Sequence, residues 1–372
     1  MQNHIWSGVS TFVGTVLGAG ILAIPYAVQK SGFWTGLTVI IIVGLAVLLM
    51  NLMLGEVVLR TKGNHQLTGY SKKYLGIWGE RAMLVSMLVG IYGALIAFTI
   101  GSGASLATLF KGSPLLWSGI FYAIMSVILW KGLRTIEKLE DWLSPGKLAL
   151  LGIVLVFAFM SSKFSALNLS GFSVNSLLVP YGVVLFALIG TASIPEVKEE
   201  TKSHWKDLKK ILIIGSLIPL IAYLLFTIAV IGVTGINTTE IATLGLSLAL
   251  GSGAGIFIHL FAIIAMSTAF MTLSLALKEM FVYDYGWSEL KAIVTTLIVP
   301  LLALFVGVQS FAGVLGVAGA LAGGIDGVLI VLMFWRAKNK GERIPEYELH
   351  TPFFVGMLLI LMFILGAVHA FL

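Results

Sequence analysis

The chain has 372 residues, of which 58% are hydrophobic and only 11% are charged. A soluble globular protein carries about 25% charged residues and could not keep so much apolar surface away from water. Because no cysteine is present, disulfide bonds, thiol chemistry and cysteine-based metal sites are excluded. These properties predict an integral membrane protein, in which the net charge of +6 has a cause other than nucleic-acid binding.

Long unbroken apolar runs predict membrane helices rather than strands, which would show short alternating segments. A helix needs about 20 apolar residues to cross the hydrocarbon core. The residues before the first run contain no Lys or Arg, so we expect a retained helix rather than a signal peptide. In chain order, the predicted spans are 6–29, 34–59, 82–110, 115–131, 146–162, 177–197, 210–235, 253–278, 290–308, 311–336 and 351–371.

The Lys and Arg residues predict the orientation of the chain, because positive residues concentrate in cytoplasmic loops. With the N-terminus in the cytoplasm, all of the 23 Lys and Arg residues except Lys30, Lys111 and Lys163 fall on the inner side. We therefore expect a multi-pass protein of the plasma membrane with a cytoplasmic N-terminus. The mixed charges around Lys198 are expected to form a solvated face at an inner gate.

A short motif, Gly-x-x-Ala/Ser-Ile-Pro, occurs at Gly20–Pro25 and again at Gly190–Pro195. Glycine permits a helix to unwind and proline removes a backbone donor. Unwound backbone is tolerated at membrane depth only where it is buried in protein or lines a cavity. The two copies lie in the first and sixth predicted spans, an offset of five, and because this offset is odd they run in opposite directions. Such a pair indicates an inverted repeat around a central site, although close helix packing is an alternative for each glycine.

The repeat predicts an all-α membrane fold with two five-helix halves, in which helices one and six are broken. We expect the first repeat at 1–163 and the second, inverted repeat at 164–336. A loop and an eleventh helix follow at 337–372.

The first copy lies within a longer pattern, Gly14-Thr15-x-x-Gly18-Ala19-Gly20-x-Leu22-Ala23-x-Pro25 followed by Gly32-Phe33. This pattern resembles the first helix of the amino acid–polyamine–organocation transporters, nearest to the aromatic amino acid permeases and the amino acid/auxin permeases. Ser267-Thr268-Ala269-Phe270 is similar to a motif in the eighth helix of the same family. The resemblance covers nearly the whole chain and implies the leucine-transporter-type fold and coupled amino acid uptake.

In that family the unwound parts of the two broken helices hold the substrate. Backbone amides near Gly20, at the positive end of a half-helix, would hold its carboxylate, and carbonyl groups near Gly190 would hold its ammonium. An aromatic side chain of helix six closes the site, and Phe186 stands in the matching place, with an ordinary core or lipid-facing role as the alternative. The residues expected to bind substrate are Gly18, Ala19, Gly20, Ile21, Phe186, Leu188, Ile189, Gly190 and Thr191.

The resemblance also bears on a sodium site. Related sodium sites combine carbonyls of helix one with Ser or Thr hydroxyls of helix eight, which are the oxygen ligands that hard cations prefer. Here Thr268 is present, but Ala269 replaces the second hydroxyl, and Gly14 stands where a sodium-coupled branch has Asn. Both departures weaken a sodium site.

Lys147 suggests proton coupling instead. Gly146-Lys147-Leu148 resembles the start of helix five in relatives that need no sodium, where the ammonium occupies the cation position. The alternative is that Ser144-Pro145 caps this helix and that Lys147 is an interfacial residue. An intramembrane carboxylate such as Asp326 indicates a function by default, unless it only hydrogen-bonds to a neighbouring helix. The residues expected to couple the ion are Lys147, Thr268, Ser267 and Asp326.

We therefore expect a secondary active amino acid transporter that works by alternating access, with proton-coupled uptake of a neutral or aromatic amino acid. A sodium-coupled symporter and a transporter-like amino acid sensor are the alternatives. We expect no enzyme activity, no metal site and no cofactor beyond the coupling ion, H⁺ or alternatively Na⁺. The expected partners are an amino acid substrate and the lipid bilayer, without nucleic acid, and the sequence does not predict an oligomeric state.

Overall fold

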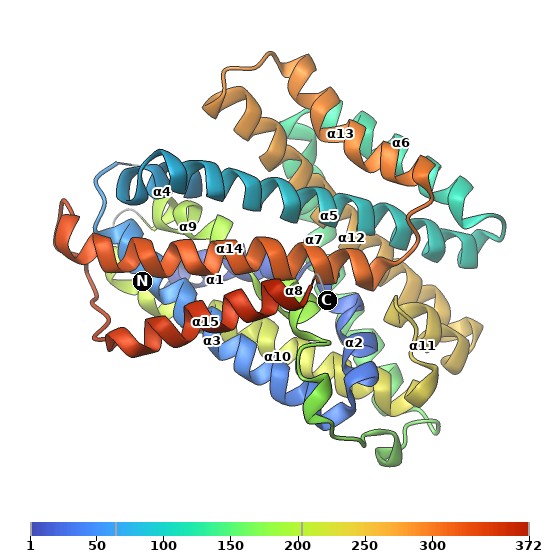
Figure 1. The fold of residues 1–372 in the computed structure, drawn as a ribbon. Coiled ribbons are helices and arrows are strands. Elements are labelled where there is room, and N and C mark those ends of the chain that lie inside the picture. Colours follow the sequence, from blue (N-terminus) through green and yellow to red (C-terminus); the bar gives the residue numbers. More distant parts are fainter. Residues whose placement is uncertain (1, 64, 202–203, 371–372) are drawn as a thin grey trace.

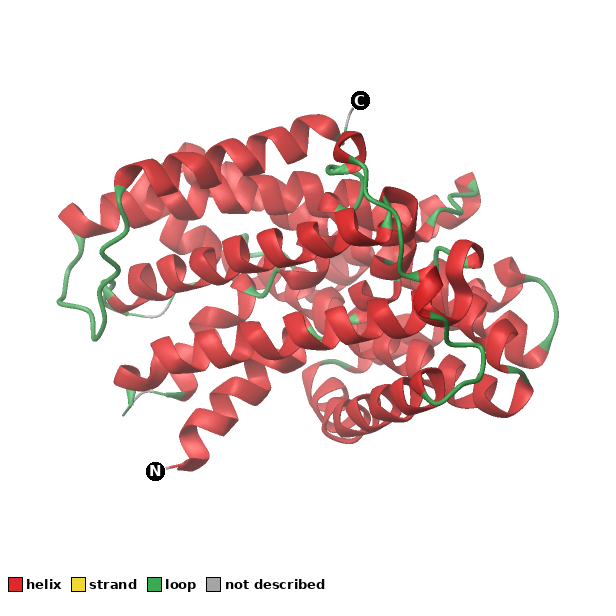
Figure 2. Cartoon of the chain, turned by 90° about the horizontal axis from the view of Figure 1, so that it is seen from below, coloured by secondary structure: helices red, strands yellow, loops and turns green. Residues whose placement is uncertain are grey.

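The computed structural model describes residues 2–63, 65–201 and 204–370, and these residues form helices and no strand. Most of the long helices lie side by side along one direction in both views (Figures 1 and 2). The unbroken long helices are α3 (Phe33–Leu59), α5 (Ile77–Phe110), α6 (Pro114–Lys131), α7 (Leu133–Phe159), α10 (Leu208–Thr234), α12 (Ser252–Glu279), α13 (Glu289–Val306), α14 (Phe311–Lys340) and α15 (Phe353–His369). Each predicted span coincides with one of these helices or with a broken helix, so the all-α prediction is confirmed.

Two helices are broken near the centre of the bundle, as the repeated motif predicts. The first consists of α1 (Gln2–Val16), a 3₁₀ turn η1 (Ala19–Leu22) and α2 (Ile24–Ser31), and its two parts are bent by 47°. The second consists of α8 (Tyr181–Leu188), a 3₁₀ turn η4 (Thr191–Ser193) and α9 (Ile194–Glu200). In Figure 1, α1 and α9 lie toward the left and α2 and α8 toward the right, so the two broken helices run in opposite directions.

Length and composition allow nine helices of the described residues to cross a membrane, or ten if the bent pair α1–α2 is one span. The second broken helix is already among the nine, as the segment Tyr181–Glu200. The shorter apolar helix α15 has 17 residues. Together these helices account for the eleven predicted spans.

Small residues let the central helices approach closely. A Cβ atom on Gly93 of α5 would lie 2.4 Å from Cβ of Ala318 in α14. A Cβ atom on Gly182 of α8 would lie 2.1 Å from the carbonyl oxygen of Gly316 in α14. Such contacts are typical of membrane helices, whose association depends on van der Waals packing. Helix α14 is thereby held against both α5 and the second broken helix.

The structure differs from the sequence prediction in two connections and at one helix start. Two short helices, α4 (Leu67–Leu75) and α11 (Ala242–Leu250), lie between predicted spans and were not expected. Helix α7 begins at Leu133, well before the predicted start at 146, and Pro145 lies inside it. The interpretation of Ser144-Pro145 as a helix cap was therefore wrong.

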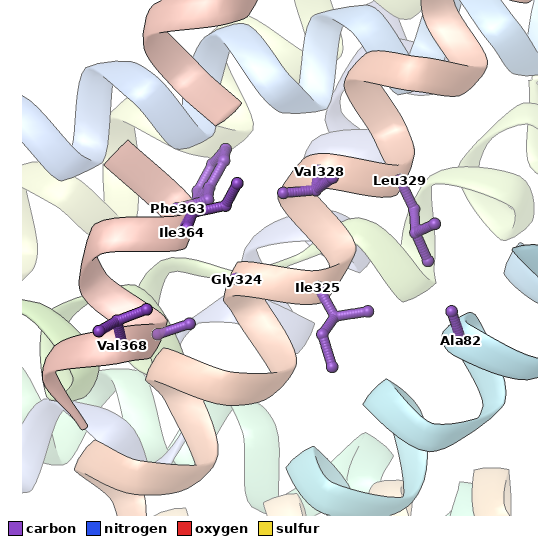
Figure 3. A pocket seen from close by; sticks show the side chains of 9 residues that line it. Ala82, Gly324, Ile325, Val328, Leu329, Phe363, Ile364 and Val368 are labelled. Carbon is purple, nitrogen blue, oxygen red and sulfur yellow. The ribbon is translucent and has the colours of Figure 1, made fainter. Parts of the chain in front are cut away.

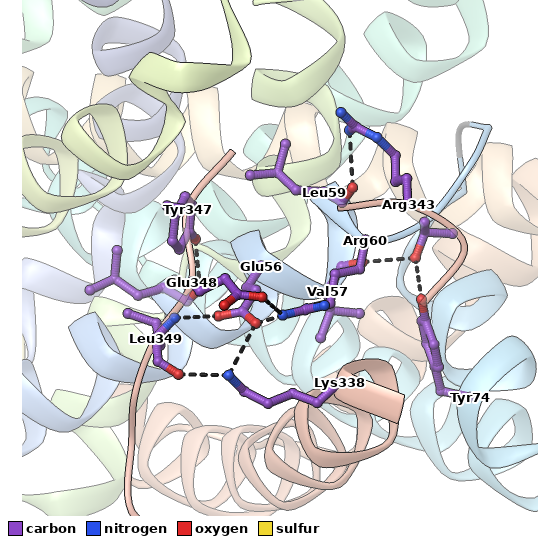
Figure 4. Close-up of polar contacts among 12 residues, drawn as sticks. Glu56, Val57, Leu59, Arg60, Tyr74, Lys338, Arg343, Tyr347, Glu348 and Leu349 are labelled. Atoms are coloured by element: carbon purple, nitrogen blue, oxygen red, sulfur yellow. Dashed lines mark hydrogen bonds and ion pairs between the residues drawn. The ribbon is translucent and has the colours of Figure 1, made fainter. Parts of the chain in front are cut away.

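A cluster of ion pairs around the buried Glu56 joins three segments (Figure 4), at the end of the bundle where N is marked in Figure 1. Glu56 near the end of α3 is fully buried, and Arg60 Nε donates a hydrogen bond to its Oε1 at 2.8 Å. Lys338 Nζ of α14 lies 3.4 Å from the same oxygen, and the Leu349 amide donates to Oε2 at 2.6 Å. One carboxylate thus ties α3 and α14 to the connection 341–352, which leads into α15.

Candidate functional site

The two helix breaks lie directly against each other. A Cβ atom on Gly20 would lie 2.8 Å from Cα of Ala187 in α8, and Gly190 packs in the same way against Val16 and Phe12 of α1. Each motif glycine therefore contacts the other broken helix. Close packing and unwound backbone, which the sequence left as alternatives, occur together at these positions.

The break in the first helix exposes the start of a helical turn. Gly18 has an extended conformation, and its amide already donates to the Val16 carbonyl at 2.6 Å. Ala19, Gly20 and Ile21 open η1 and are buried. The first amides of a helix have no intrahelical acceptor, and together they carry a partial positive charge. The polarity of this break suits a carboxylate, with the amide of Gly18 already engaged.

The break in the second helix exposes the end of one. Helix α8 ends at Leu188, and Ile189 is extended. The carbonyl of Gly190 accepts hydrogen bonds from the amide of Ser193 at 3.2 Å and from its hydroxyl at 2.9 Å. The last carbonyls of a helix have no intrahelical donor and carry a partial negative charge. Amides on one side and carbonyls on the other suit the two charges of an amino acid, and the Thr191 side chain is buried beside them.

Phe186, the predicted gate, is half-buried and lies between the first break and α14. A Cβ atom on Gly20 would lie 3.4 Å from its Cδ1, and a Cβ atom on Gly319 would lie 2.5 Å from its Cβ. The ring therefore belongs to the walls of the breaks rather than to the lipid-facing surface.

Helix α12 brings the predicted cation ligands to the first break. A Cβ atom on Gly18 would lie 3.7 Å from Cβ of Ala269. The neighbouring side chains of Thr268 and Ser267 are buried, and the Thr268 hydroxyl donates to the Ala265 carbonyl at 3.1 Å. The oxygen of Thr268 keeps its capacity as an acceptor or a metal ligand.

The two charged candidates, Lys147 and Asp326, are buried on other helices. The Lys147 side chain is 4% exposed, in the interior of α7, which packs against α12. Asp326 of α14 is also buried, and the hydroxyl of Ser86 in α5 donates to its Oδ1 at 2.6 Å. The described contact of Asp326 is therefore a hydrogen bond to a neighbouring helix and not to the breaks.

The sequence analysis missed Tyr223 of α10, which is fully buried. Its hydroxyl lies 2.5 Å from the carbonyl oxygen of Val16 and 3.1 Å from that of Ala187. One side chain therefore contacts both broken helices at once. The signal in the sequence was a single aromatic hydroxyl in the middle of an apolar run.

The segment after the second break is less solvated than predicted. Lys198 of α9 is buried, and its Nζ donates to the Gly63 carbonyl at 2.9 Å. The expectation of a solvated face is therefore wrong for this residue. The Thr11 hydroxyl of α1 donates to Glu200 Oε1 at 3.0 Å, which joins α1 to α9 at the same end of the molecule.

Two cavities lie outside the breaks. One of about 370 Å³, between α5, α14 and α15, is lined by apolar residues such as Ile325 and Phe363 (Figure 3). It offers no partner for a charged group. The other, of about 340 Å³, is lined by residues of α2, α8, α14 and α15, including Lys30 and Tyr181. It adjoins the halves of the broken helices that point away from the N-terminus.

Comparison with known proteins gives the family. The sequence matches the tryptophan/tyrosine permease family over residues 1–370. The tyrosine-specific transport system 1 of Haemophilus influenzae (strain ATCC 51907 / DSM 11121 / KW20 / Rd) is 26% identical over 358 residues, covering 89% of this chain and 88% of that protein. The glutamine transporter 2 of Aliivibrio fischeri (strain ATCC 700601 / ES114) is 25% identical over 338 residues, covering 86% of each.

A solved structure, that of MhsT in complex with L-phenylalanine, superposes with a TM-score of 0.72 at 16% identity. It covers 97% of this chain and 98% of that chain. This likeness confirms the leucine-transporter-type fold. The chain belongs to the tryptophan/tyrosine permease family, and it is therefore a multi-pass amino acid transporter rather than an enzyme.

Proposed function

We propose that this chain takes up a neutral or aromatic amino acid by secondary active transport with alternating access. One observation carries the proposal: two antiparallel broken helices meet at their breaks, with helix-start amides on one and helix-end carbonyls on the other. Such half-helices at matching places in two repeats form the substrate sites of many transporters. The tyrosine and glutamine transporters among the relatives, and the L-phenylalanine bound to the structural neighbour, support the substrate class.

The polarity of the breaks assigns the two ends of the substrate. Amides of Ala19, Gly20 and Ile21 hold the carboxylate, because the positive end of a half-helix favours an anion. Carbonyls of Leu188 and Ile189 take the ammonium. The hydroxyl of Thr191 and the ring of Phe186 contribute side-chain contacts at the same place.

Proton coupling through Lys147 is the mechanism that we favour. The Lys147 ammonium is buried within α7, where it is shielded from bulk water and can exchange a proton with the transport pathway. The sodium alternative has one observation in its favour, the contact between the first break and α12 beside Thr268. In the proton-coupled mechanism the Lys147 ammonium takes the place of the sodium ion. Two positive charges at one site would repel each other strongly, so the two mechanisms exclude one another.

Uptake into proteoliposomes tests the proposal. The purified protein would be offered labelled tyrosine, phenylalanine, tryptophan and glutamine, with an inward pH gradient, an inward sodium gradient or neither. We expect the pH gradient to accelerate uptake in the absence of sodium, and an ionophore that collapses the gradient to abolish this acceleration. Uptake that needs sodium would reassign the coupling ion. Tight binding without uptake or counterflow would contradict transport and favour the sensor alternative.

A further inference from the structure

We propose that Tyr223 is a positioning residue that holds the two helix breaks at the separation needed to bind substrate. The inference deepens the proposed function, because it concerns the same site. Its observation is independent of the motif: a hydroxyl from a third, unbroken helix lies within 2.5 Å of the Val16 carbonyl oxygen and 3.1 Å of the Ala187 carbonyl oxygen.

Both carbonyls belong to helix ends. Helix α1 ends at Val16 and α8 ends at Leu188, and the last four carbonyls of an α-helix have no intrahelical donor. Tyr223 therefore caps the C-termini of both half-helices with one O–H group. The Val16 carbonyl also accepts a hydrogen bond from the Gly18 amide. The Tyr223 side chain is 0% exposed, so bulk water cannot replace its hydroxyl at the Ala187 carbonyl.

Repulsion between the two helix ends explains why a hydrogen-bond donor is needed to keep α1 and α8 at a fixed distance. Each helix C-terminus carries a partial negative charge of about half an elementary charge, and two of them converge on one point here. Two converging carbonyls repel each other, and the repulsion is stronger away from water. The positive end of the Tyr223 O–H dipole attracts both, which keeps the ends of α1 and α8 together.

Helix α10 is suited to this task because it is continuous through the level of the breaks. It runs unbroken from Leu208 to Thr234 and packs along α1. A Cβ atom on Gly215 of α10 would lie 2.7 Å from the Phe12 ring, one turn before the end of α1. Tyr223 therefore fixes the spacing of the breaks from a neighbouring helix that is not itself interrupted, and the amides and carbonyls that bind the substrate depend on that spacing.

Binding of a labelled amino acid to the purified protein tests this role. The substitution Tyr223→Phe removes only the hydroxyl. Its matched control is Tyr122→Phe, because the Tyr122 hydroxyl donates to the Leu297 carbonyl in α13 at 2.8 Å, away from the breaks. The probe is the amino acid of the transport panel that the wild type binds most tightly. We expect Tyr223→Phe to weaken binding about tenfold, the scale of one buried acceptor left without its donor. Tyr122→Phe should leave the Kd within about twofold, while it lowers the Tm about as much as Tyr223→Phe does.

A second variant keeps the test decisive where Tyr223→Phe does not fold. Placing para-aminophenylalanine at position 223 keeps the ring and offers two N–H donors, one for each carbonyl. We expect its Kd to lie within about threefold of wild type, because a neutral N–H donor replaces the hydroxyl at similar net energy. A tenfold loss in this variant, an unchanged Kd in Tyr223→Phe, or an equal loss in Tyr122→Phe would overturn the inference. Because the readout is binding, failure of the wild type to transport would count against the proposed function alone.

Discussion

A Cβ atom on Gly190 would lie 2.5 Å from Cγ2 of Val16, the last residue of α1. The φ angle of Gly190 is −131°, which any residue can adopt. Close approach of the two helices, and not the backbone conformation, therefore requires glycine here. The side chains that would collide with a larger residue at position 190 belong to α1. A smaller residue in α1 should therefore relieve the collision.

The substitution Gly190→Ala should therefore weaken substrate binding by pushing the two breaks apart. Overpacking of this kind costs about 1–3 kcal/mol, and the companion change Val16→Ala should recover part of it by removing the colliding methyl group. Binding affinity and the Tm in detergent would be measured together. Gly152→Ala is the matched control, because a Cβ atom there meets nothing within 4 Å. Equal behaviour of the two alanine variants would contradict the contact.

Lys147→Ala should abolish the acceleration of uptake by a pH gradient, although exchange of substrate across the membrane can persist. The reason is that the buried ammonium of Lys147 is the group we propose to carry the proton. Uptake in proteoliposomes at several imposed gradients measures the effect, with Thr268→Ala as the comparison. A wild type that requires sodium and ignores the pH gradient would reassign the coupling to Thr268 and the carbonyls of helix one.

Glu56→Gln should destabilise the protein strongly. It removes the charge of the buried Glu56 from Arg60 and from the partly exposed Lys338, and Arg60 is left with the half-exposed Glu348. Breaking a buried ion pair costs about 3–5 kcal/mol. The matched change is Glu80→Gln, because Glu80 pairs with the exposed Lys72 at 3.1 Å, and such pairs contribute about 0–1 kcal/mol. Unfolding in detergent would compare the two variants, and equal losses would contradict the cluster's role.

The orientation of the chain can be read from thiol labelling, because the protein has no cysteine. Cysteines introduced at Lys72 and Lys206 should react only from the cytoplasmic side, and one at Lys111 only from outside. All three side chains are exposed, so the reagent reaches them in the folded protein. Labelling of Lys72→Cys and Lys111→Cys from the same face would disprove the predicted topology.

Acid should weaken one contact of the connection 341–352. The hydrogen bond from the Lys73 ammonium holds the pKa of Glu342 below its ordinary value of 4.5. A lowered pKa means that Glu342 stabilises the fold above that ordinary value and that this contribution disappears as the pH falls through the lowered one. The difference in Tm between wild type and Glu342→Gln should therefore shrink as the pH falls below 4.5 and through the lowered pKa of Glu342. A difference that stays constant through this range would argue against the contact.

The spans could be predicted because charged residues flank most of the apolar runs. The two breaks could be predicted because Gly20 and Gly190 begin the same motif. The sequence prediction misplaced the start of α7, since Pro145 is a common first-turn residue but here lies within the helix. The apolar residues Ile136, Leu139 and Leu143, spaced at helical intervals, extend the helix beyond the membrane-spanning part.

The parts of the site that could not be predicted depend on contacts between distant segments. Tyr223 is one polar group in an apolar run, and nothing local shows that its hydroxyl faces two helix ends. Lys198 lies among charges that are typical of a solvated loop, and only the fold places it against the Gly63 carbonyl. Such burial is a property of tertiary packing rather than of the local pattern.

The order in which the chain is synthesised determines when the contacts around Glu56 can form. Leu349 follows Glu56 by 293 residues, so a growing chain synthesises the carboxylate long before the amide and the Lys338 ammonium that contact it. During that interval the partner already present is Arg60, four residues further along the chain and directly after the end of α3. The connection after α14 therefore supplies a hydrogen-bond donor to a carboxylate that was synthesised 293 residues earlier.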